Sequence, residues 1–336
     1  MQYRPLGSSG LHVSPICLGT MSFGSPVAEA DAIRLTHGAI DLGINFIDTA
    51  NVYEGYNRTF GSAGGLSEQI VGKAVRDRRD RVVVATKFAA PIGMGPQDRG
   101  GSASHLLREV DRCLQRLQTD TIDLLVMHWP DKRTPLETTL GAMDVAVSQG
   151  KVRYFGTSNH SAAQLCELLW LADKRQWTRV VSSQVPYSML QREFHNDLAF
   201  CERHQIGVTP WRSLQGGLLT GKYRRGQAAP PGSRYAETSD MKTPGMWGGD
   251  PSTANFDQLE AIEKLANEAG VPMAQYALAW TLSQPAMASL IVGAKRIEQL
   301  EQAVASLEVK IPEAHHAGID ELCPPPWHQD DPIRSA

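Results

Sequence analysis

The chain has 336 residues, of which 42% are hydrophobic and 21% charged, and its formal net charge is −3 at pH 7. This composition is typical of a soluble globular protein with a large core, and the lack of a basic field argues against nucleic acid as a partner. No apolar run reaches the roughly 20 residues that a membrane-spanning helix needs, and residues 1–5 lack the apolar segment of a signal peptide, so we expect a cytoplasmic protein with no membrane partner.

The chain begins with two short strand-like runs, residues 3–6 and 11–13, which flank the turn sequence Gly7-Ser8-Ser9-Gly10. Strand-like runs separated by a few Gly and Ser residues are typical of a β-hairpin. We expect this hairpin to precede the main sheet and to close one end of it.

Eight further runs, rich in β-branched and apolar residues, alternate with helical patterns. They cover residues 16–18, 45–48, 82–86, 122–127, 152–157, 180–184, 206–209 and 289–292. Between them, apolar residues recur at helical spacing, as in Leu106, Val110, Cys113 and Leu117. Ser161, followed by Gln at the third position after it, predicts a capping box at a helix start.

The number of strands decides between two fold classes. By length, the chain fits two domains of about 150 residues, but an α/β barrel routinely spans about 250 residues as one domain. Eight strands separated by helices favour a closed barrel over an open doubly wound sheet, because parallel neighbours need helical crossovers. We therefore predict a (β/α)8 TIM barrel, an α/β fold, in which residues 1–336 form a single domain.

A long segment without periodicity, residues 223–252, comes after the seventh barrel strand and is dense in Gly and Pro. Loops of this length in a compact domain are usually lids or binding loops, or else disordered. We favour a lid or clasp.

Polar and aromatic residues stand just past the ends of six predicted strands: Asp48, Lys87, His128, Asn159, Gln184 and Trp211. Each alone has an ordinary structural explanation, as a helix cap, a solvated side chain or a packed core residue. In a (β/α)8 barrel, however, the carboxyl ends of the strands meet at one face, where the chemistry is carried out. Their shared position therefore predicts one site.

Tyr53, five positions after Asp48, completes a proton-transfer set with Lys87 and His128. A phenol has a pKa of about 10 and donates a proton poorly near neutrality unless its anion is stabilised. The Lys87 ammonium would stabilise that anion, Asp48 would hold the ammonium in place, and His128 would orient a carbonyl or relay its proton. This quartet is suited to reducing a carbonyl group with a nicotinamide hydride.

Several stretches resemble the aldo-keto reductase family, and the likeness runs from about residue 3 to residue 307. They are Phe-Ile-Asp-Thr-Ala-x-x-Tyr at 46–53, Val-Ala-Thr-Lys at 84–87, His-Trp-Pro at 128–130, Gly-Thr-Ser-Asn at 156–159, Gln-x-x-Tyr-Ser at 184–188, Gly-Leu-Leu-Thr-Gly-Lys at 217–222 and Ile-Val-Gly-Ala at 291–294. No single stretch is decisive, but their order and spacing together are specific.

The resemblance implies a role for each matching position. Asp48, Tyr53, Lys87 and His128 would be catalytic, with Tyr53 as the proton donor. Ser158, Asn159 and Gln184 would hold the nicotinamide carboxamide, and Trp211 would stack on the ring. The full set expected to bind NADPH is Gly19, Thr20, Met21, Asp48, Ser158, Asn159, Gln184, Trp211, Arg212, Ser213, Leu214, Gly216, Gly217, Lys222, Arg234, Gly293, Ala294, Lys295, Gln299 and Gln302.

Charge complementarity favours NADPH over NADH. Lys222 and the pair Ser233-Arg234 resemble cationic clasp positions over the pyrophosphate, most like the branch that includes potassium-channel β subunits. Lys295 and Arg296 would meet the 2′-phosphate.

Two positions depart from the family pattern. The family usually has Glu-Asn near the adenosine, where this chain has Gln302-Ala303, and it usually has Ser-Pro-Leu after the stacking aromatic, where this chain has Arg212-Ser213-Leu214. The first departure puts the adenine contact in doubt, and the sequence offers no physical reason for the charge of Arg212.

The substrate is expected to be a small-molecule carbonyl. Phe23, Tyr56, Trp129 and Trp247, with Met21, would line an apolar pocket for a bulky or cyclic carbonyl such as a keto-sugar or a secondary-metabolite ketone, or would simply pack near the barrel mouth. Residues 54–66 would shape access to the pocket. An alternative function is a nicotinamide-binding regulatory subunit, like the channel β proteins, with little turnover. The sequence does not indicate the oligomeric state or the physiological direction.

Other chemistries lack their motifs. No Gly-x-Gly-x-x-Gly opens a helix after a strand, and none of the eight tyrosines is followed by Lys four positions later. No His-Glu-x-x-His or Gly-x-Ser-x-Gly occurs, so neither zinc nor a serine nucleophile is expected. The five cysteines are odd in number, scattered and never spaced as Cys-x-x-Cys, which predicts reduced and mostly buried thiols.

Overall fold

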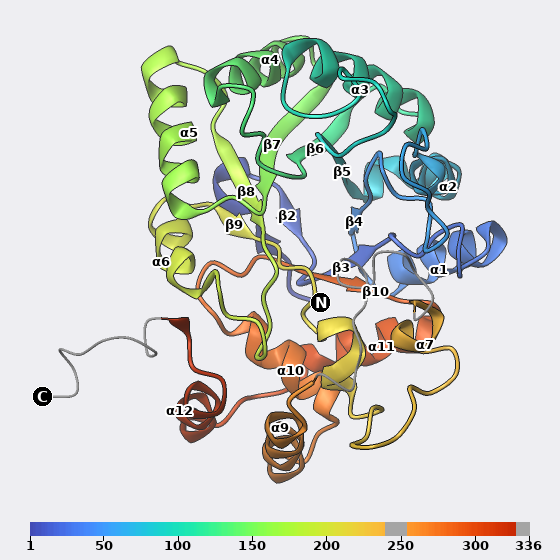
Figure 1. Ribbon diagram of the computed structural model, residues 1–336, viewed down its shortest axis with the longest axis vertical. Coiled ribbons are helices and arrows are strands. Elements are labelled where there is room, and N and C mark those ends of the chain that lie inside the picture. Colours follow the sequence, from blue (N-terminus) through green and yellow to red (C-terminus); the bar gives the residue numbers. More distant parts are fainter. Residues whose placement is uncertain (239–253, 327–336) are drawn as a thin grey trace, which may run out of the picture.

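The computed structural model describes residues 1–238 and 254–326, and within these ranges the chain forms a parallel barrel (Figure 1). Eight strands lie in the order β10-β3-β4-β5-β6-β7-β8-β9. Their bounds are β3 Ile16–Gly19, β4 Phe46–Asp48, β5 Val83–Phe88, β6 Ile122–Met127, β7 Val152–Ser158, β8 Val180–Gln184, β9 Gly207–Val208 and β10 Leu290–Gly293. All eight predicted strands are therefore present, within a few residues of the expected bounds.

The barrel closes between β9 and the segment that leads into β10. The amide of Val208 donates to the Ala286 carbonyl over 2.8 Å, and the Ala288 amide donates back to the Val208 carbonyl over 2.9 Å. Beyond these, the Ile291 amide donates to the Pro210 carbonyl over 3.0 Å. These bonds give the two end strands a common edge, so the predicted (β/α)8 barrel is confirmed.

Helices cover the outside of the barrel. Their bounds are α1 Glu29–Asp41, α2 Leu66–Val75, α3 Ala103–Leu117, α4 Leu136–Ser148, α5 Ala162–Arg175, α6 His195–Arg203, α7 Arg234–Thr238, α9 Phe256–Glu268, α10 Met273–Leu282, α11 Ile297–Ala305 and α12 Glu313–Leu322, with 3-10 turns at η1 Gly7–Ser9, η2 Arg76–Arg81, η3 Gln215–Thr220 and η5 Ser306–Glu308.

The expected helical stripes face the barrel. Leu106, Val110, Cys113 and Leu117 of α3 are at most 2% exposed, because residues three and four apart share one helix face. The predicted capping box at the start of α5 is also present: the Ser161 side chain accepts from the Gln164 amide, and the Gln164 side chain accepts from the Ser161 amide. None of the helices in the described ranges is both long enough and apolar enough to cross a membrane.

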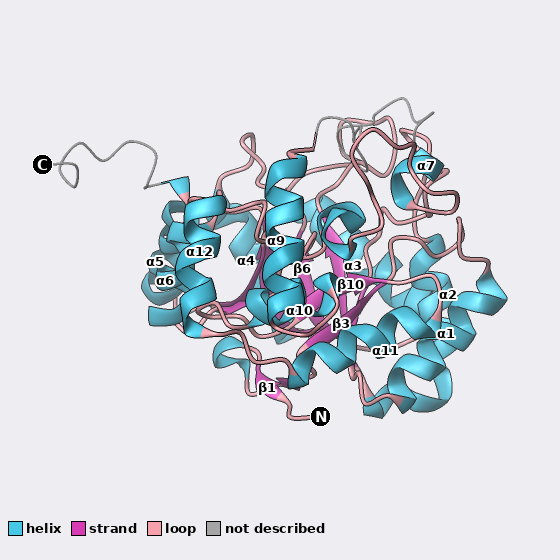
Figure 2. Cartoon of the chain, turned by 90° about the horizontal axis from the view of Figure 1, so that it is seen from below, coloured by secondary structure: helices cyan, strands magenta, loops and turns pink. Residues whose placement is uncertain are grey.

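The N-terminal hairpin closes one end of the barrel, as predicted. Its strands are β1 Arg4–Pro5 and β2 His12–Val13, and β1 lies at the end of the barrel opposite α7 (Figure 2). Leu6 and Val13 are fully buried and pack with residues of the barrel interior. A Cβ at Gly7 would lie only 2.2 Å from the Val181 carbonyl oxygen, so the hairpin approaches β8 more closely than a side chain would allow.

The described part of residues 223–252 is more ordered than its composition predicts. The short helix α7 lies in it, after the 3-10 turn η3. Helix α7 falls within the range expected to be an aperiodic loop, and at five residues it is too short to leave a hydrophobic period in the sequence. The rest of that expectation, residues 239–252, lies outside the described residues.

Four of the five cysteines are buried, namely Cys17, Cys113, Cys201 and Cys323, whereas Cys166 is exposed. This agrees with the expectation of mostly buried thiols.

Candidate active site

The centre of the site is a buried ion pair between Lys87, near the end of β5, and Asp48, at the end of β4. Both side chains are 2% exposed. Lys87 Nζ also donates to the Thr49 carbonyl over 2.8 Å, and Gln184 Nε2 donates to the second carboxylate oxygen of Asp48 over 2.7 Å. Burial lowers the pKa of Lys87, but the Asp48 carboxylate and the Tyr53 hydroxyl together outweigh it and raise that pKa above its ordinary value. Lys87 therefore stays a cation.

Tyr53 lies over this pair, on the loop after β4. The Lys87 ammonium is 4.8 Å from the centre of the Tyr53 ring. We expected Lys87 to make the phenol a stronger acid, but the net direction is the opposite. Burial raises the pKa of Tyr53, and the nearby positive charge of Lys87 offsets the rise only in part. The phenol is thus protonated at neutral pH, as a proton donor must be.

His128, just past the end of β6, faces the edge of the Tyr53 ring, with 5.8 Å between the ring centres and an interplanar angle of 78°. Burial, with the positive charges of Lys87 and Arg58, holds the pKa of His128 well below its ordinary value, so the imidazole is neutral. Its Nδ1 atom is buried and has no hydrogen-bond partner among the described residues. A neutral ring in this position orients a polar group and adds no charge.

The residues expected to hold a nicotinamide lie beside the quartet and are bonded to it. Asn159 Nδ2 donates to the His128 carbonyl and to Ser158 Oγ, each over 3.0 Å. The Asn159 amide donates to the Gln184 carbonyl over 2.9 Å, and the backbone of Asn159 is left-handed (φ +61°), a conformation that Asn tolerates better than most residues. The structure therefore brings Ser158, Asn159 and Gln184 together with Asp48 and His128.

The loop after β9 begins with Trp211, whose amide donates to the Val185 carbonyl over 3.0 Å. Arg212 comes next with φ +65°, and its guanidinium lies 5.5 Å from the Trp211 ring centre. Burial, then the charge of Arg234, lowers the pKa of Arg212. The Ser213 Oγ is buried without a hydrogen-bond partner in the described part of the chain. Arg212 is thus a cation stacked on an aromatic ring, near another cation. Leu214, Gly216 and Gly217 continue this loop into η3.

Two cations, Arg234 and Lys295, lie near Tyr56, and a third, Lys222, lies near Lys295. The Tyr56 ring centre lies 5.6 Å from the Arg234 guanidinium and 5.7 Å from the Lys295 ammonium. Lys295 is paired with Glu237 of α7 and donates to the Gly232 carbonyl over 2.9 Å. Burial, then the charge of Lys295, lowers the pKa of Lys222. Cations this close to one another favour a polyanionic ligand between them.

The first and last barrel strands lie side by side. Gly19, at the end of β3, pairs with Gly293, at the end of β10, and Ala294 comes directly after Gly293. Thr20 Oγ1 donates to the Asp48 carbonyl over 3.0 Å, and Arg234 Nη2 approaches Met21 Sδ to 3.7 Å. This arrangement places the predicted first-loop residues between the quartet and the cations.

Two predicted cofactor residues have partners within the protein. The Gln299 side-chain oxygen accepts from the Lys295 amide over 2.7 Å and from the Arg296 amide over 3.2 Å, at the start of α11. Gln302 is exposed, and its side-chain oxygen accepts from Gln275 Nε2 over 2.6 Å. Their cofactor contacts stay predictions.

The four predicted pocket residues differ in position. Trp129 is 42% exposed and stacks on His128, with 5.7 Å between the ring centres. Tyr56 lies among the cations described above. Phe23 is fully buried in the core between the barrel and its helices, so packing accounts for it. Trp247 lies outside the described residues.

One residue near the quartet is absent from the predicted set. Arg58 acts on the His128 pKa and donates to the Val52 carbonyl over 3.0 Å and to the Pro91 carbonyl over 2.6 Å. The only signal in the sequence is an arginine in a Gly-rich loop five positions after Tyr53. That signal is too weak to assign a role.

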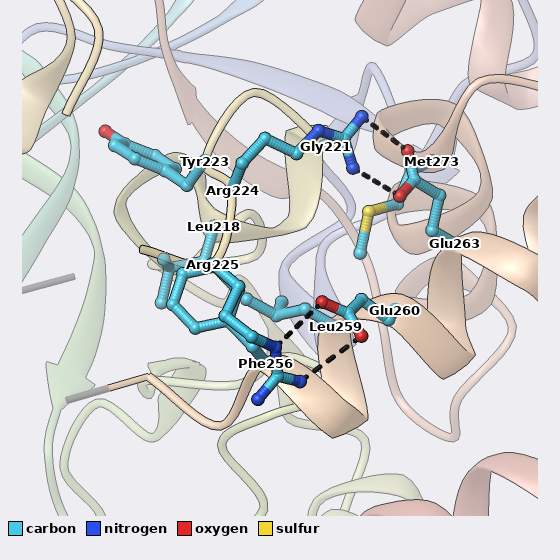
Figure 3. Close-up of a pocket in the computed structure, with 10 residues that line it drawn as sticks. All are labelled: Leu218, Gly221, Tyr223, Arg224, Arg225, Phe256, Leu259, Glu260, Glu263 and Met273. Carbon is cyan, nitrogen blue, oxygen red and sulfur yellow. Dashed lines mark hydrogen bonds and ion pairs between the residues drawn. The ribbon is translucent and has the colours of Figure 1, made fainter. Parts of the chain in front are cut away.

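A small pocket lies away from the quartet, between residues 218–225 and helix α9 (Figure 3). Arg224 bonds both carboxylate oxygens of Glu263, over 2.5 and 3.0 Å, and Arg225 bonds both oxygens of Glu260, each over 3.2 Å. No member of the quartet lines it. These pairs instead tie the segment that carries Lys222 to α9.

Comparisons with known proteins agree with this geometry. A model of the aldo/keto reductase family matches residues 15–323. An uncharacterized oxidoreductase, YrpG, from Bacillus subtilis is 36% identical over 97% of this chain and 97% of its own. A probable voltage-gated potassium channel subunit beta from Arabidopsis thaliana is 35% identical over 92% of each chain. Versiconal hemiacetal acetate reductase from Aspergillus parasiticus is 32% identical over 93% of this chain and 94% of its own. The family match includes all eight barrel strands and the whole quartet.

Proposed function

Because the chain belongs to the aldo/keto reductase family, whose members include oxidoreductases, we propose that it reduces an aldehyde or ketone to an alcohol with NADPH and that Tyr53 is the proton donor. The observation that carries this proposal is the position of Tyr53: a protonated phenol over the buried Lys87–Asp48 pair and edge-on to a neutral His128. The 32% identity to versiconal hemiacetal acetate reductase adds support from a relative that is named as a reductase.

The residues around the barrel mouth fit a dinucleotide phosphate. Cations at Lys222, Arg234 and Arg212 suit a pyrophosphate. The buried Ser213 Oγ, which has no hydrogen-bond partner within residues 1–238 and 254–326, suits a phosphate oxygen. Lys295 and Arg296, past the end of β10, would hold the 2′-phosphate that distinguishes NADPH from NADH.

The nicotinamide end has its own set of groups. Ser158, Asn159 and Gln184 would hold the carboxamide, and Trp211 would lie against the ring. When bound, NADPH supplies the hydride. The bonds from Gln184 to Asp48 and from Asn159 to the His128 carbonyl fix this set relative to the quartet, so the hydride donor and the proton donor would share one rigid frame.

The residues of the quartet would divide the work. His128 would orient the carbonyl oxygen towards the Tyr53 hydroxyl, and Tyr53 would protonate the oxygen as negative charge develops on it. Lys87 would stabilise the resulting phenolate, because its ammonium is held charged by Asp48. Burial of the pair keeps water from screening this charge.

A carbonyl panel tests the proposal directly. The purified chain with NADPH is offered aliphatic, aromatic and sugar-derived aldehydes and ketones, and NADPH consumption is followed by its absorbance. We expect turnover of at least one class. Coenzyme binding without turnover of any carbonyl would overturn the proposed reaction.

The similarity to a channel subunit supports a second candidate, a nicotinamide-binding regulatory subunit with little turnover. The two candidates share the same coenzyme site, and they differ in whether the bound coenzyme is consumed or serves as a signal. Negligible steady-state turnover together with stable co-purification of a membrane protein would favour the regulatory function.

A further inference from the structure

We infer that the substrate is a bulky, apolar carbonyl compound, an aryl or polycyclic aldehyde or ketone, and that Phe60 and Met94 hold its far end. This inference rests on the proposed function and adds two residues to which no role is otherwise given. With Trp129 they form what we term the apolar rim, on the loops that come after β4, β5 and β6.

The side chains of the apolar rim are unusually exposed to solvent for large hydrophobic residues. Within the described ranges, the large hydrophobic side chains left exposed are Met1, Tyr3, Phe60, Met94, Trp129, Val145 and Trp170. Phe60, at 71%, and Met94, at 72%, are the most exposed of them. Three of the seven thus stand on consecutive loops at one face of the barrel, where β4, β5 and β6 lie side by side (Figure 1). Exposed apolar side chains that gather near one site are a common mark of ligand binding.

A close contact joins the loop that carries Phe60 to the loop that carries Met94. A Cβ at Gly61, the neighbour of Phe60, would lie 2.6 Å from Met94 Sδ, so the tips of the two loops touch. Trp129 stacks on His128, which faces Tyr53. Trp129 therefore joins the rim to the side of the proposed proton donor.

Hydrogen bonds hold the loops after β4 and β5 in place, so the rim is a preformed surface. Arg58, two positions before Phe60, donates to the carbonyls of Val52 and Pro91 and so joins the loop after β4 to the loop after β5. Ser62 Oγ donates to the Glu54 carboxylate within the first of these loops. A loop backbone held in place in this way needs little further ordering when a ligand binds.

Charge argues for an apolar ligand. Lys87 is paired with Asp48, and Arg234, which acts on Tyr53, is assigned above to the coenzyme pyrophosphate, so the remaining cation that acts on the quartet is Arg58, through His128. Its guanidinium already donates to two backbone carbonyls, so a phosphorylated carbonyl would have to compete with them. The rim offers apolar area, which gains most from a ligand that is itself apolar.

The test compares substrates across matched variants. The chain and the variants Phe60→Ala, Met94→Ala and Trp170→Ala are assayed with NADPH and three substrates: 2-naphthaldehyde, propanal and glyceraldehyde 3-phosphate. Trp170 is the control, because it is a 56% exposed aromatic residue on α5, outside the rim. We expect 2-naphthaldehyde to have the highest kcat/KM. Its kcat/KM relative to propanal should fall roughly tenfold in each rim variant, through KM, and stay constant in Trp170→Ala.

A binding measurement separates this inference from the proposed function. Calorimetric titration of the NADPH-loaded chain with 2-naphthalenemethanol needs no turnover, and its Kd should rise in both rim variants and not in Trp170→Ala. Unchanged substrate ratios and an unchanged Kd in the rim variants would overturn the inference, and so would a preference for glyceraldehyde 3-phosphate. A change of oligomeric mass in the rim variants without a change in the ratios would also overturn it and would assign the rim to a protein interface. If neither the chain nor any variant turns over a carbonyl, the proposed function fails. The calorimetric comparison then decides by itself whether the rim binds an apolar ligand.

Discussion

The side-chain amide of Gln184 donates a 2.7 Å hydrogen bond to Asp48, and this bond joins the two halves of the site. Gln184 is at the end of β8 and Asp48 at the end of β4, on opposite sides of the barrel interior. Asp48 thereby has one oxygen on Lys87 and the other on the residue expected to hold the nicotinamide. A substitution at Gln184 or Asp48 should therefore affect both halves of the site.

Replacement of Gln184 by Leu should lower stability and coenzyme affinity together. The substitution leaves one oxygen of a buried carboxylate without a donor, which costs about 1.5–3 kcal/mol. We expect urea denaturation to show this loss and fluorescence titration to show a higher Kd for NADPH. Gln176→Leu is the control, since Gln176 lies just past helix α5 and bonds only a local carbonyl. A higher Kd with unchanged stability would mean that the bond to Asp48 contributes nothing.

Tyr53→Phe should abolish carbonyl reduction and leave coenzyme binding and the fold intact. The substitution removes only the hydroxyl that would protonate the carbonyl oxygen, and such proton transfer contributes roughly 100-fold or more to rate. NADPH consumption and NADPH titration measure the two properties separately. Tyr3→Phe, at an exposed hydroxyl on the hairpin side of the barrel, should change neither. Retained turnover in Tyr53→Phe would assign the proton donor elsewhere.

Removing only the positive charge of the buried pair should lower the free energy of unfolding more than removing both charges. Lys87→Met leaves the Asp48 carboxylate, only 2% exposed, without its counter-ion, and breaking a buried pair in this way costs about 3–5 kcal/mol. Adding Asp48→Asn removes the stranded charge, so the double variant should recover part of the loss. Free energies of unfolding for the two single variants and the double variant give the coupling. If the losses in free energy of unfolding from the two single variants simply added up in the double variant, the pairing of Lys87 with Asp48 would be contradicted.

The barrel and the quartet were predictable because both depend on short-range patterns. The strand runs and the stripe from Leu106 to Leu117 are local, and closure of the barrel then places residues from strand ends at one face whatever their spacing in sequence. The packing of Phe23 and the hydrogen bonds of Arg58 to two loops depend on which loops touch. The hydrophobic periodicity of the sequence does not indicate which loops touch. The sequence also did not predict that the side-chain oxygen of Gln299 accepts a hydrogen bond from the Lys295 amide at the start of α11. The direction of the Tyr53 pKa shift was also beyond the sequence, because it depends on the balance between burial and the charge of Lys87.

Arg212→Ser, which restores the usual residue of the family, should weaken NADPH binding roughly fivefold at low salt, as expected for one partly exposed charge pair. The structure accounts for Arg212 as a cation stacked on Trp211 and close to Arg234. If it contacts a phosphate, the difference between the chain and the variant should shrink as salt is raised from about 0.01 M to about 1 M, because the Debye length falls from about 30 Å to about 3 Å. Equal Kd values at low salt would leave Arg212 with a purely local role. Arg203→Ser, on the outer helix α6, controls for net charge.

His128 should make the chain lose stability as the pH falls below about 6.5. Its pKa in the folded chain is held well below the ordinary value, by burial first and by Lys87 and Arg58 next, so the unfolded chain binds a proton that the folded chain does not. Stability is therefore full above the unfolded pKa and falls with pH by up to about 1.4 kcal/mol per unit until the folded pKa is reached. His105 and His160 also have lowered pKa values from burial and add to the slope. His128→Gln should remove only the contribution of His128. Urea denaturation between about pH 7 and pH 5 measures the slope, and an identical slope in the variant would show that His128 is already protonated in the folded chain.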